Sequence, residues 1–379
     1  MSRRFLRLIR YIPEIPFFKR GGFVKTRTSS FLAIIIDNLI WILVLAGLAI
    51  FSALSPSFRT PFNLVNILYR SAALGMLVIG QAFAMISGNF DLSSESGLGL
   101  TAMVAGLFMA STTNGGLGYE LSPFVAILIM IAVGLTIGLI NGFLITRMHM
   151  NNLIVTIAML MILRGLIYII SPGATASFFP ASFNWLGGGN LLKIPMGKGN
   201  LAIPTASVFI ILAFIVAHIV TRYTQFGRNM YAVGSNPVAA KDTGIETDKI
   251  IRIVYLISGF CMAIGGWLIA GRLDSATPRV GAGLIFPVQA AAVVGGVSLF
   301  GGRGTMIGAF GGLLLWSILD SGLSIMEVSP FWIEASRGLL LLFAVGLDAI
   351  KVKGMHRRAL EESLATTQIG LKDDKIITD

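Results

Sequence analysis

Long apolar runs separated by short polar segments fill most of the chain. About ten of these runs approach the ~20 residues that an α-helix needs to cross the hydrocarbon core of a bilayer. The pattern therefore predicts an all-α polytopic membrane protein with about ten transmembrane helices. The expected spans lie near residues 31–52, 64–87, 97–113, 122–146, 152–171, 201–221, 249–272, 286–300, 304–324 and 331–350.

The polar segments define the rest of the organisation. Residues 1–30 form a basic tail, for which a helix on anionic lipid and an unfolded segment are both open. A transmembrane domain is expected over 31–350 and a polar tail over 351–379. Within the domain, 172–200 is the longest segment expected outside the cell, where its aromatic residues suit either an interfacial belt or a docking surface. The polar segment 222–248 is expected inside.

Composition and charge agree with a membrane location. The chain is 55% hydrophobic and 12% charged, with a net charge of +11. Soluble domains carry about 25% charged residues. Most Lys and Arg residues fall in alternate polar segments, which predicts that both termini are cytoplasmic. The basic residues flank the spans and do not gather with aromatic residues on one face, so nucleic-acid binding is not expected.

The stretch 221–252 is the longest polar, charged and turn-rich segment between two apolar runs. The charge pattern places it in the cytoplasm. The chain lacks the G-x-x-x-x-G-K-[ST] phosphate loop, so we expect no ATP binding by this chain itself. The three histidines are scattered, and no catalytic or metal-binding constellation is visible, so the protein is not expected to be an enzyme. The stretch is therefore interpreted as a docking site for a soluble partner.

Polar side chains inside apolar runs are costly in lipid unless they find a partner or line a wet cavity. Each alone could be structural, but together they suit a polar passage for a solute. Neutral amide and hydroxyl groups can replace water around a polyol. Near the last run, Glu334 and Arg337 are expected to pair at i,i+3. The candidate pathway residues are Gln81, Asp91, Ser93, Asn141, Thr156, Arg164 and Gln289.

Two turn-like segments, 86–97 and 294–305, interrupt the apolar runs. Irregular backbone at membrane depth is tolerated only where it is buried in protein or lines a cavity. The first segment carries Asp91 and Glu95. These carboxylates could form a cation site, bind solute hydroxyls, or cap a helix together with the neighbouring serines.

Several segments between about residue 64 and residue 350 resemble one family. The segment FGRNMYAVGSNPVAAKDTGI resembles the cytoplasmic-loop signature of the monosaccharide (ribose/xylose-type) ABC importer permeases. VVGGVSLFGGRGTMIGAFGG is similar to their glycine-rich turn, and ISGNFDLSS to their acidic turn. The central and last spans are also similar to theirs. The matching segments are 226–245, 293–312, 86–94, 139–169 and 328–348.

The resemblance implies a helical fold shared with the vitamin B12-type (type II) importers. It implies a bacterial inner-membrane permease that imports a small hydroxylated solute, such as a monosaccharide. The implied partners are a second permease subunit (identical or different), a cytoplasmic ATPase that holds ATP and Mg²⁺, and an external solute-binding protein. A coupling helix beginning at Asn236 would fit the ATPase, with Gly227 and Gly234 shaping turns. The implied coupling residues are Gly227, Arg228, Gly234, Asn236, Pro237, Ala239, Ala240, Lys241, Asp242 and Gly244.

The chain departs from the family pattern at two places. Ser94-Glu95-Ser96 replaces Val-Gly-Ser after the acidic turn, and Ile285 and Pro287 stand where the family often has Glu and Asp. Both leave the solute open, with a branched-chain amino acid, a nucleoside or a signalling molecule as alternatives. A secondary transporter acting alone would belong to another class, but such proteins usually carry an intramembrane ion relay. A structural membrane scaffold is a third interpretation.

Overall fold

The computed structural model describes residues 38–196, 199–339, 342 and 345–346. The expected basic tail, the C-terminal tail and part of the last expected span (340–341, 343–344 and 347–350) lie outside the described residues. Internal contacts divide the chain into residues 1–39 and 40–379. The fold described here is that of the second unit.

In the part of the chain that the structure describes, six helices are long and apolar enough to cross a membrane, which confirms a helical, multi-pass membrane protein. Their boundaries follow the expected spans closely. They are α3 (Pro61–Ile86), α5 (Pro123–Thr146), α6 (Asn152–Ile170), α8 (Thr205–Tyr223), α11 (Thr247–Leu273) and α13 (Met306–Ile325).

Three further apolar helices are shorter than a full span. They are α2 (Leu39–Leu54), α4 (Ser94–Met109) and α12 (Ile285–Val294). Helix α4 covers most of the span expected near 97–113, whereas the helix expected over 286–300 is shorter than predicted. Helix α12 ends at Val294 with Gly295 as its cap, and the chain then turns through Gly296, whose φ of 85° lies in the left-handed region. Residues 331–339 are also helical.

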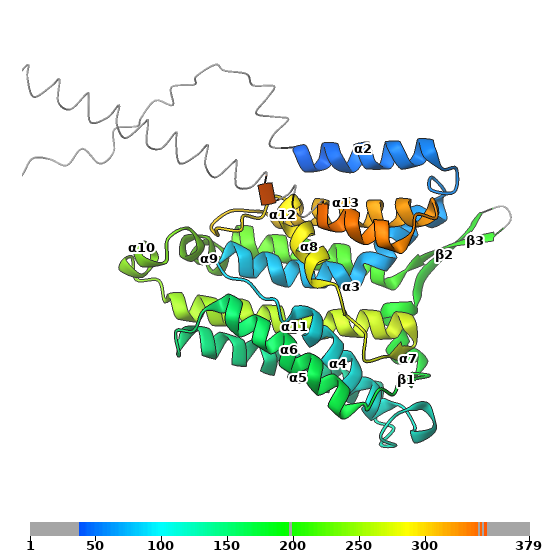
Figure 1. Cartoon of the computed structure of the whole chain (residues 1–379), viewed down its shortest axis with the longest axis horizontal. Helices are drawn as coiled ribbons and strands as arrows, with labels where there is room; N and C mark the ends of the chain where they lie inside the picture. The colour runs from blue at the N-terminus through cyan, green and yellow to red at the C-terminus, as the bar shows by residue number, and fades with distance from the viewer. Residues whose placement is uncertain (1–37, 197–198, 340–341, 343–344, 347–379) are drawn as a thin grey trace, which may run out of the picture. The chain divides into compact units, whose positions relative to one another are not determined.

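Figure 1 shows why α4 and α12 are short. The loop after α3 runs back along the bundle before α4 begins, and the loop before α12 does the same from the opposite end. Two side-chain contacts agree with this depth. Asp91, in the first loop, contacts Ser258 midway along α11, and the second loop contacts Arg164 in the interior of α6.

Helices α5 and α11 cross in close contact through glycine. A Cβ atom at Gly134 would collide with the carbonyl oxygen of Gly259, and one at Gly138 with that of Tyr255. Small residues let backbones approach in lipid, where dispersion contacts and not hydrophobic exclusion hold helices together. Gly134 and Gly138, spaced four residues apart, therefore form a packing ridge on α5.

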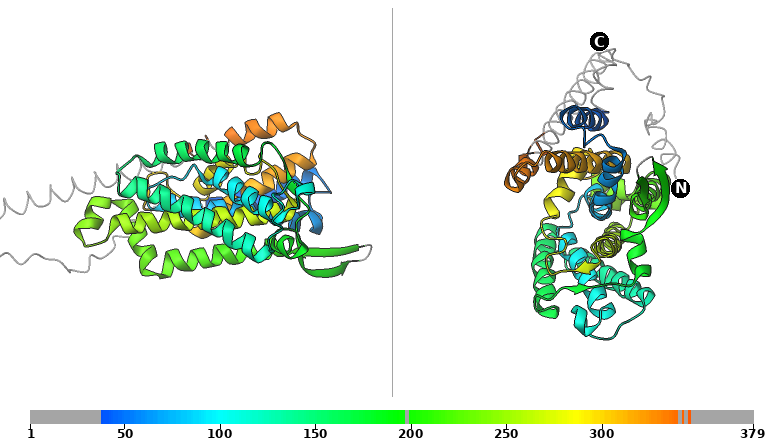
Figure 2. Two further views of the ribbon diagram at one scale, coloured as in Figure 1. Left: turned by 90° about the horizontal axis from the view of Figure 1, so that it is seen from below. Right: turned by 90° about the vertical axis from the view of Figure 1, so that its right-hand side faces the viewer.

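Small elements cover the two ends of the helices (Figures 1 and 2). After α6, strand β1 (Ala176–Ser177) pairs with β4 (Ser275–Ala276), and α7 (Ala181–Gly188) precedes a hairpin of β2 (Asn190–Met196) and β3 (Gly199–Pro204). A 3₁₀ turn, η2 (Thr112–Asn114), follows α4. At the other end, α9 (Gln225–Ser235) and α10 (Pro237–Asp242) join α8 to α11.

The segment after α6 was expected to present its aromatic residues as a belt or a docking surface. Phe179 and Phe183 are instead buried, and their rings meet edge to face with the ring centroids 5.4 Å apart. Only Phe178 and Trp185 remain exposed there. Two of the four aromatic side chains therefore pack the protein interior.

Replacing Gly138 with Leu should separate α5 from α11, because the added side chain meets backbone that cannot move aside. Overpacking of this kind costs about 1–3 kcal/mol or more. We expect a sharp fall in the fraction of purified protein that stays monodisperse in detergent. Gly165→Leu is the matched control, since no atom lies within 4 Å of a Cβ built there. Equal losses in the two variants would contradict this account of the crossing.

Candidate functional site

Helix α10, in the loop between α8 and α11, begins where the sequence predicted. Asn236 caps it, because its side-chain oxygen accepts hydrogen bonds from the backbone N–H groups of Val238 and Ala239, each at 3.1 Å. Pro237 occupies the first helical position, where a missing N–H costs nothing. Gly244 follows the helix with a φ of 85°, a conformation that glycine adopts without strain.

Most of the proposed coupling residues are exposed. Val238 is 70% exposed, and Lys241 and Asp242 lie at the end of α10 in solvent. This surface combines an apolar side chain with two opposite charges. The exposed members of the set are Arg228, Asn236, Pro237, Ala239, Lys241, Asp242 and Gly244, and the buried members are Gly227, Gly234 and Ala240.

Sequence reasoning missed helix α9. Gly227 and Gly234 were expected to shape turns, but both lie inside this helix. Thr224 caps α9 by accepting a hydrogen bond from the Gly227 N–H at 3.1 Å. The Ser/Thr-x-x-Gly spacing at 224–227 carried no glutamate to complete a capping box, so the start signal was weak.

Helix α9 packs directly on the end of α3 and on the glycine-rich turn before α13. A Cβ atom at Gly234 would collide with the carbonyl oxygen of Ile86, which also accepts a hydrogen bond from the Gly302 N–H at 2.9 Å. The Tyr231 hydroxyl donates to the carbonyl oxygen of Gly304 at 2.7 Å, and burial raises the pKa of Tyr231. A displacement of α9 must therefore move α3 and this turn.

A buried polar cluster joins the loop after α3 to α5 and α11. Asp91 is fully buried and accepts hydrogen bonds from the hydroxyls of Ser93 and Ser258, both at 2.6 Å. Asn141 donates to the Ser93 hydroxyl at 2.9 Å. The structure thus brings together three of the predicted pathway residues: Asp91, Ser93 and Asn141.

The interpretation of this turn as a helix cap needs correction. Ser93 occupies the N-cap position of α4, but its side chain makes no capping hydrogen bond. Asp91 instead accepts a hydrogen bond from the Ser93 N–H at 3.1 Å. Among the described residues, no group of three His, Cys, Asp or Glu side chains could hold a metal ion.

The other predicted pathway residues lie apart from this cluster. The Thr156 hydroxyl donates to the Asn152 carbonyl oxygen of its own helix at 2.8 Å. Gln81 and Gln289 are 1% and 8% exposed, and neither side-chain amide has a hydrogen-bond partner. Unpaired buried amides are costly, so these two glutamines are not explained by packing alone.

Glu95 and Arg164 form an ion pair between α4 and α6, with Oε1 and Nη2 separated by 3.5 Å. Both side chains also bind backbone of the loop between β4 and α12. Glu95 accepts a hydrogen bond from the Ile285 N–H at 3.0 Å, and Arg164 donates to the carbonyl oxygen of Val280 at 3.1 Å.

A polar cavity of about 260 Å³ opens between α3, α12, α13 and residues 331–339. We call it the outer cavity, because the charge pattern places this end of α3 outside. Its lining includes the charged residues Arg70, Asp320, Glu334 and Arg337, and the indole of Trp316.

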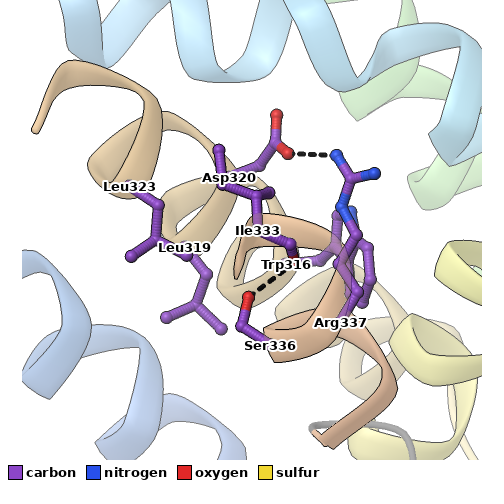
Figure 3. A pocket seen from close by; sticks show the side chains of 7 residues that line it. All are labelled: Trp316, Leu319, Asp320, Leu323, Ile333, Ser336 and Arg337. Atoms are coloured by element: carbon purple, nitrogen blue, oxygen red, sulfur yellow. Dashed lines mark hydrogen bonds and ion pairs between the residues drawn. The ribbon is translucent and has the colours of Figure 1, made fainter. Parts of the chain in front are cut away.

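Arg337 organises the charged wall. Its Nη1 atom lies 2.7 Å from Oε2 of Glu334, as the i,i+3 spacing predicted. Its Nη2 atom lies 2.5 Å from Oδ1 of Asp320, a pairing that the sequence did not indicate. Its guanidinium lies over the Trp316 ring, 5.8 Å from the centroid. Figure 3 shows this side chain between the indole and the Asp320 carboxylate in an adjoining small pocket.

Comparison with known proteins agrees with this geometry. The chain is 34% identical to the galactose/methyl galactoside import permease protein of Escherichia coli, over 85% of this chain and 97% of that protein. It is 33% identical to the ribose import permease protein of Bacillus subtilis, over 80% of this chain and 89% of the relative. No solved structure matches the chain.

The apolar helices, the cytoplasmic module and these relatives define a permease of the ABC importer class. The chain belongs to the family described as branched-chain amino acid transport system / permease component, whose model matches residues 63–345.

Replacing Ser258 with Ala should destabilise the helical bundle, because the buried Asp91 carboxylate then loses one of its hydroxyl donors. A hydrogen bond to a charged group contributes about 1.5–3 kcal/mol. We expect a clear fall in the thermal unfolding midpoint of the purified protein. Thr136→Ala is the control, since the Thr136 hydroxyl is exposed and bonds only to its own helix. A midpoint that moves equally in both variants would contradict a special role for Ser258.

Proposed function

We propose that the chain is the transmembrane subunit of a bacterial inner-membrane ABC importer for a monosaccharide or a related polyol. The observation that carries this proposal is the near full-length similarity to galactose and ribose import permeases. The proposed assembly contains a second permease subunit, a cytoplasmic ATPase and an external solute-binding protein. The described helices are compatible with about ten spans and the fold of the vitamin B12-type importers.

In the proposed mechanism, motion of the ATPase is transmitted to the transmembrane helices through α10. A short helix seated in a groove on the ATPase would move as a rigid body when the ATPase closes. The support for this role is the exposed surface of Val238, Lys241 and Asp242, combined with the packing of α9 on Ile86 and Gly302. Because these contacts are between backbone atoms, motion would reach α3 without being absorbed by flexible side chains.

The proposed solute route begins at the outer cavity and continues toward the buried polar residues. Leu74 lines the cavity, and Gln81 lies two helical turns further along the same face of α3. Pro287 lines the cavity from α12, the short helix that also carries Gln289. The two glutamines lack partners in this conformation, which is what a group waiting for a solute hydroxyl would show.

A branched-chain amino acid is the second candidate solute. The family description names that substrate class, and the outer cavity carries charges of both signs, which suit a zwitterion. The matching relatives named above import sugars, which favours the first candidate. Uptake of labelled galactose, ribose and leucine by vesicles containing the assembled complex separates the two.

Inverting both charges at the end of α10, with Lys241→Glu and Asp242→Lys, should reduce ATP-driven solute uptake at least about tenfold, a loss equivalent to about 1.4 kcal/mol in the fit to the ATPase. Both side chains are exposed, so the fold and the membrane level should not change. ATP hydrolysis by the complex should no longer follow solute supply. Radiolabelled solute uptake and phosphate release are the measurements.

The matched control is Arg147→Glu, a charge inversion at the same end of the bundle but outside α9 and α10. It should retain uptake. Normal transport in the Lys241/Asp242 variant would count against coupling through α10. Solute uptake driven by an ion gradient, in the absence of the ATPase, would contradict the ABC mechanism.

Replacing Gln81 with Leu should separate stability from transport. The substitution removes two buried polar groups that have no partners, so the free energy of unfolding should stay the same or rise. Solute uptake should nevertheless fall several-fold, because the passage loses a hydrogen-bonding amide. Unfolding in denaturant tests the prediction for stability, and uptake under saturating ATP tests the prediction for transport. A more stable variant with full uptake would remove Gln81 from the solute route.

A further inference from the structure

Two irregular segments enter the helical bundle from opposite ends and meet inside it (Figure 1). One is the loop 87–93, which leads from α3 to α4. The other is the segment 277–284, which leads from β4 to α12. Their meeting point is Glu95, in the first turn of α4.

Glu95 holds the start of α12. Its Oε2 atom accepts a hydrogen bond from the Ile285 N–H at 3.0 Å, and Ile285 is the first residue of that helix. A carboxylate is favourable there, because the helix dipole and the free N–H groups concentrate positive charge at a helix N-terminus. A Cβ atom at Gly281 would collide with the Glu95 carbonyl oxygen, so the segment also lies directly on α4.

Arg164 holds the middle of the same segment. Its Nη1 atom donates to the carbonyl oxygens of Pro278 and Val280, both at 3.1 Å, while Nη2 faces Glu95. The Glu95 and Arg164 side chains are only 9% and 18% exposed. Separating buried opposite charges leaves each without compensation, so this arrangement resists opening.

The other side of the segment faces the outer cavity. Ala282, Gly283 and Leu284 line it, followed by Pro287 in α12. The segment therefore forms one wall of the cavity. The paired side chains of Glu95 and Arg164 attach it to α4 and α6 through hydrogen bonds to the backbone of Pro278, Val280 and the adjoining Ile285.

We propose that Glu95 and Arg164 are positioning residues that clasp the segment 277–284 in place as the wall of the outer cavity, and that this clasp opens when solute passes inward. The structural role of the clasp concerns this chain alone. The opening of the clasp during transport rests on the proposed function.

Cysteine labelling tests the clasp without any need for transport. Val280 is 5% exposed, so a Val280→Cys variant in right-side-out vesicles should react slowly with a membrane-impermeant maleimide. Cys261 is the one cysteine in the sequence and is 3% exposed, so it reports any general loosening of the bundle. Five proteins are compared. Four carry Val280→Cys, either alone or combined with Glu95→Gln, with Arg164→Gln or with Thr136→Ala, and the fifth carries Glu95→Gln with Cys261 as its one cysteine.

We expect Glu95→Gln and Arg164→Gln each to accelerate labelling at position 280 about tenfold, the shift in an opening equilibrium that follows loss of one charged contact. Thr136→Ala should leave the rate unchanged. Glu95→Gln in the chain with only Cys261 should remain unlabelled. Unchanged labelling at position 280, or labelling of Cys261, would overturn the clasp.

Uptake by the complete complex tests the opening of the clasp during transport. Glu95→Gln at normal membrane level should lower the maximal uptake rate several-fold, while solute binding to the separate binding protein is unaffected. Faster labelling with normal uptake would refute the transport role and leave the clasp. Absence of uptake in the unmodified chain with every tested solute would count against the proposed function, and the labelling result would still decide the clasp.

Discussion

Backbone that leaves a helix inside the membrane must find its hydrogen-bond partners in protein, because hydrocarbon offers none. Two segments of this chain meet that constraint with side chains from neighbouring helices. Tyr255 donates to the Phe90 carbonyl oxygen at 2.8 Å, and Arg164 donates to two carbonyl oxygens of the segment 277–284. These buried polar contacts allow α4 and α12 to begin within the bundle.

Backbone contacts of this kind also connect the α9 end of the permease to the outer cavity. On the cytoplasmic side, Gly234 of α9, Ile86 of α3 and Gly302 meet through backbone atoms. The loop that follows α3 then leads inward to Asp91 and on to Glu95. A rigid shift at α9 is thus only one short loop away from the residues that hold the outer cavity wall. Packed interiors transmit such shifts because they have few voids to absorb them.

The sequence predicted most of this fold, since apolar length alone identifies a spanning helix. It also predicted the start of α10, because Asn236-Pro237 is a strong local signal. It missed the early end of α12, where apolar residues continue after the two glycines at 295–296. The pairing of Glu95 with Arg164 and with Ile285 joins residues distant in the chain, and no periodic pattern reports such a contact. The Asp320–Arg337 pair was missed for the same reason.

The two departures from the family pattern prove to be neighbours. The resemblance implies an acidic residue where Ile285 stands and a small residue where Glu95 stands. In this structure the Glu95 carboxylate binds the backbone N–H of Ile285 itself. A carboxylate therefore remains at the start of α12, supplied from α4 instead of from α12. Because Glu95 is engaged by Ile285 and Arg164, its charge faces protein and not the outer cavity. The exchange therefore keeps a carboxylate at the start of α12, while the residues of this helix region that line the outer cavity, Leu284 and Pro287, are uncharged.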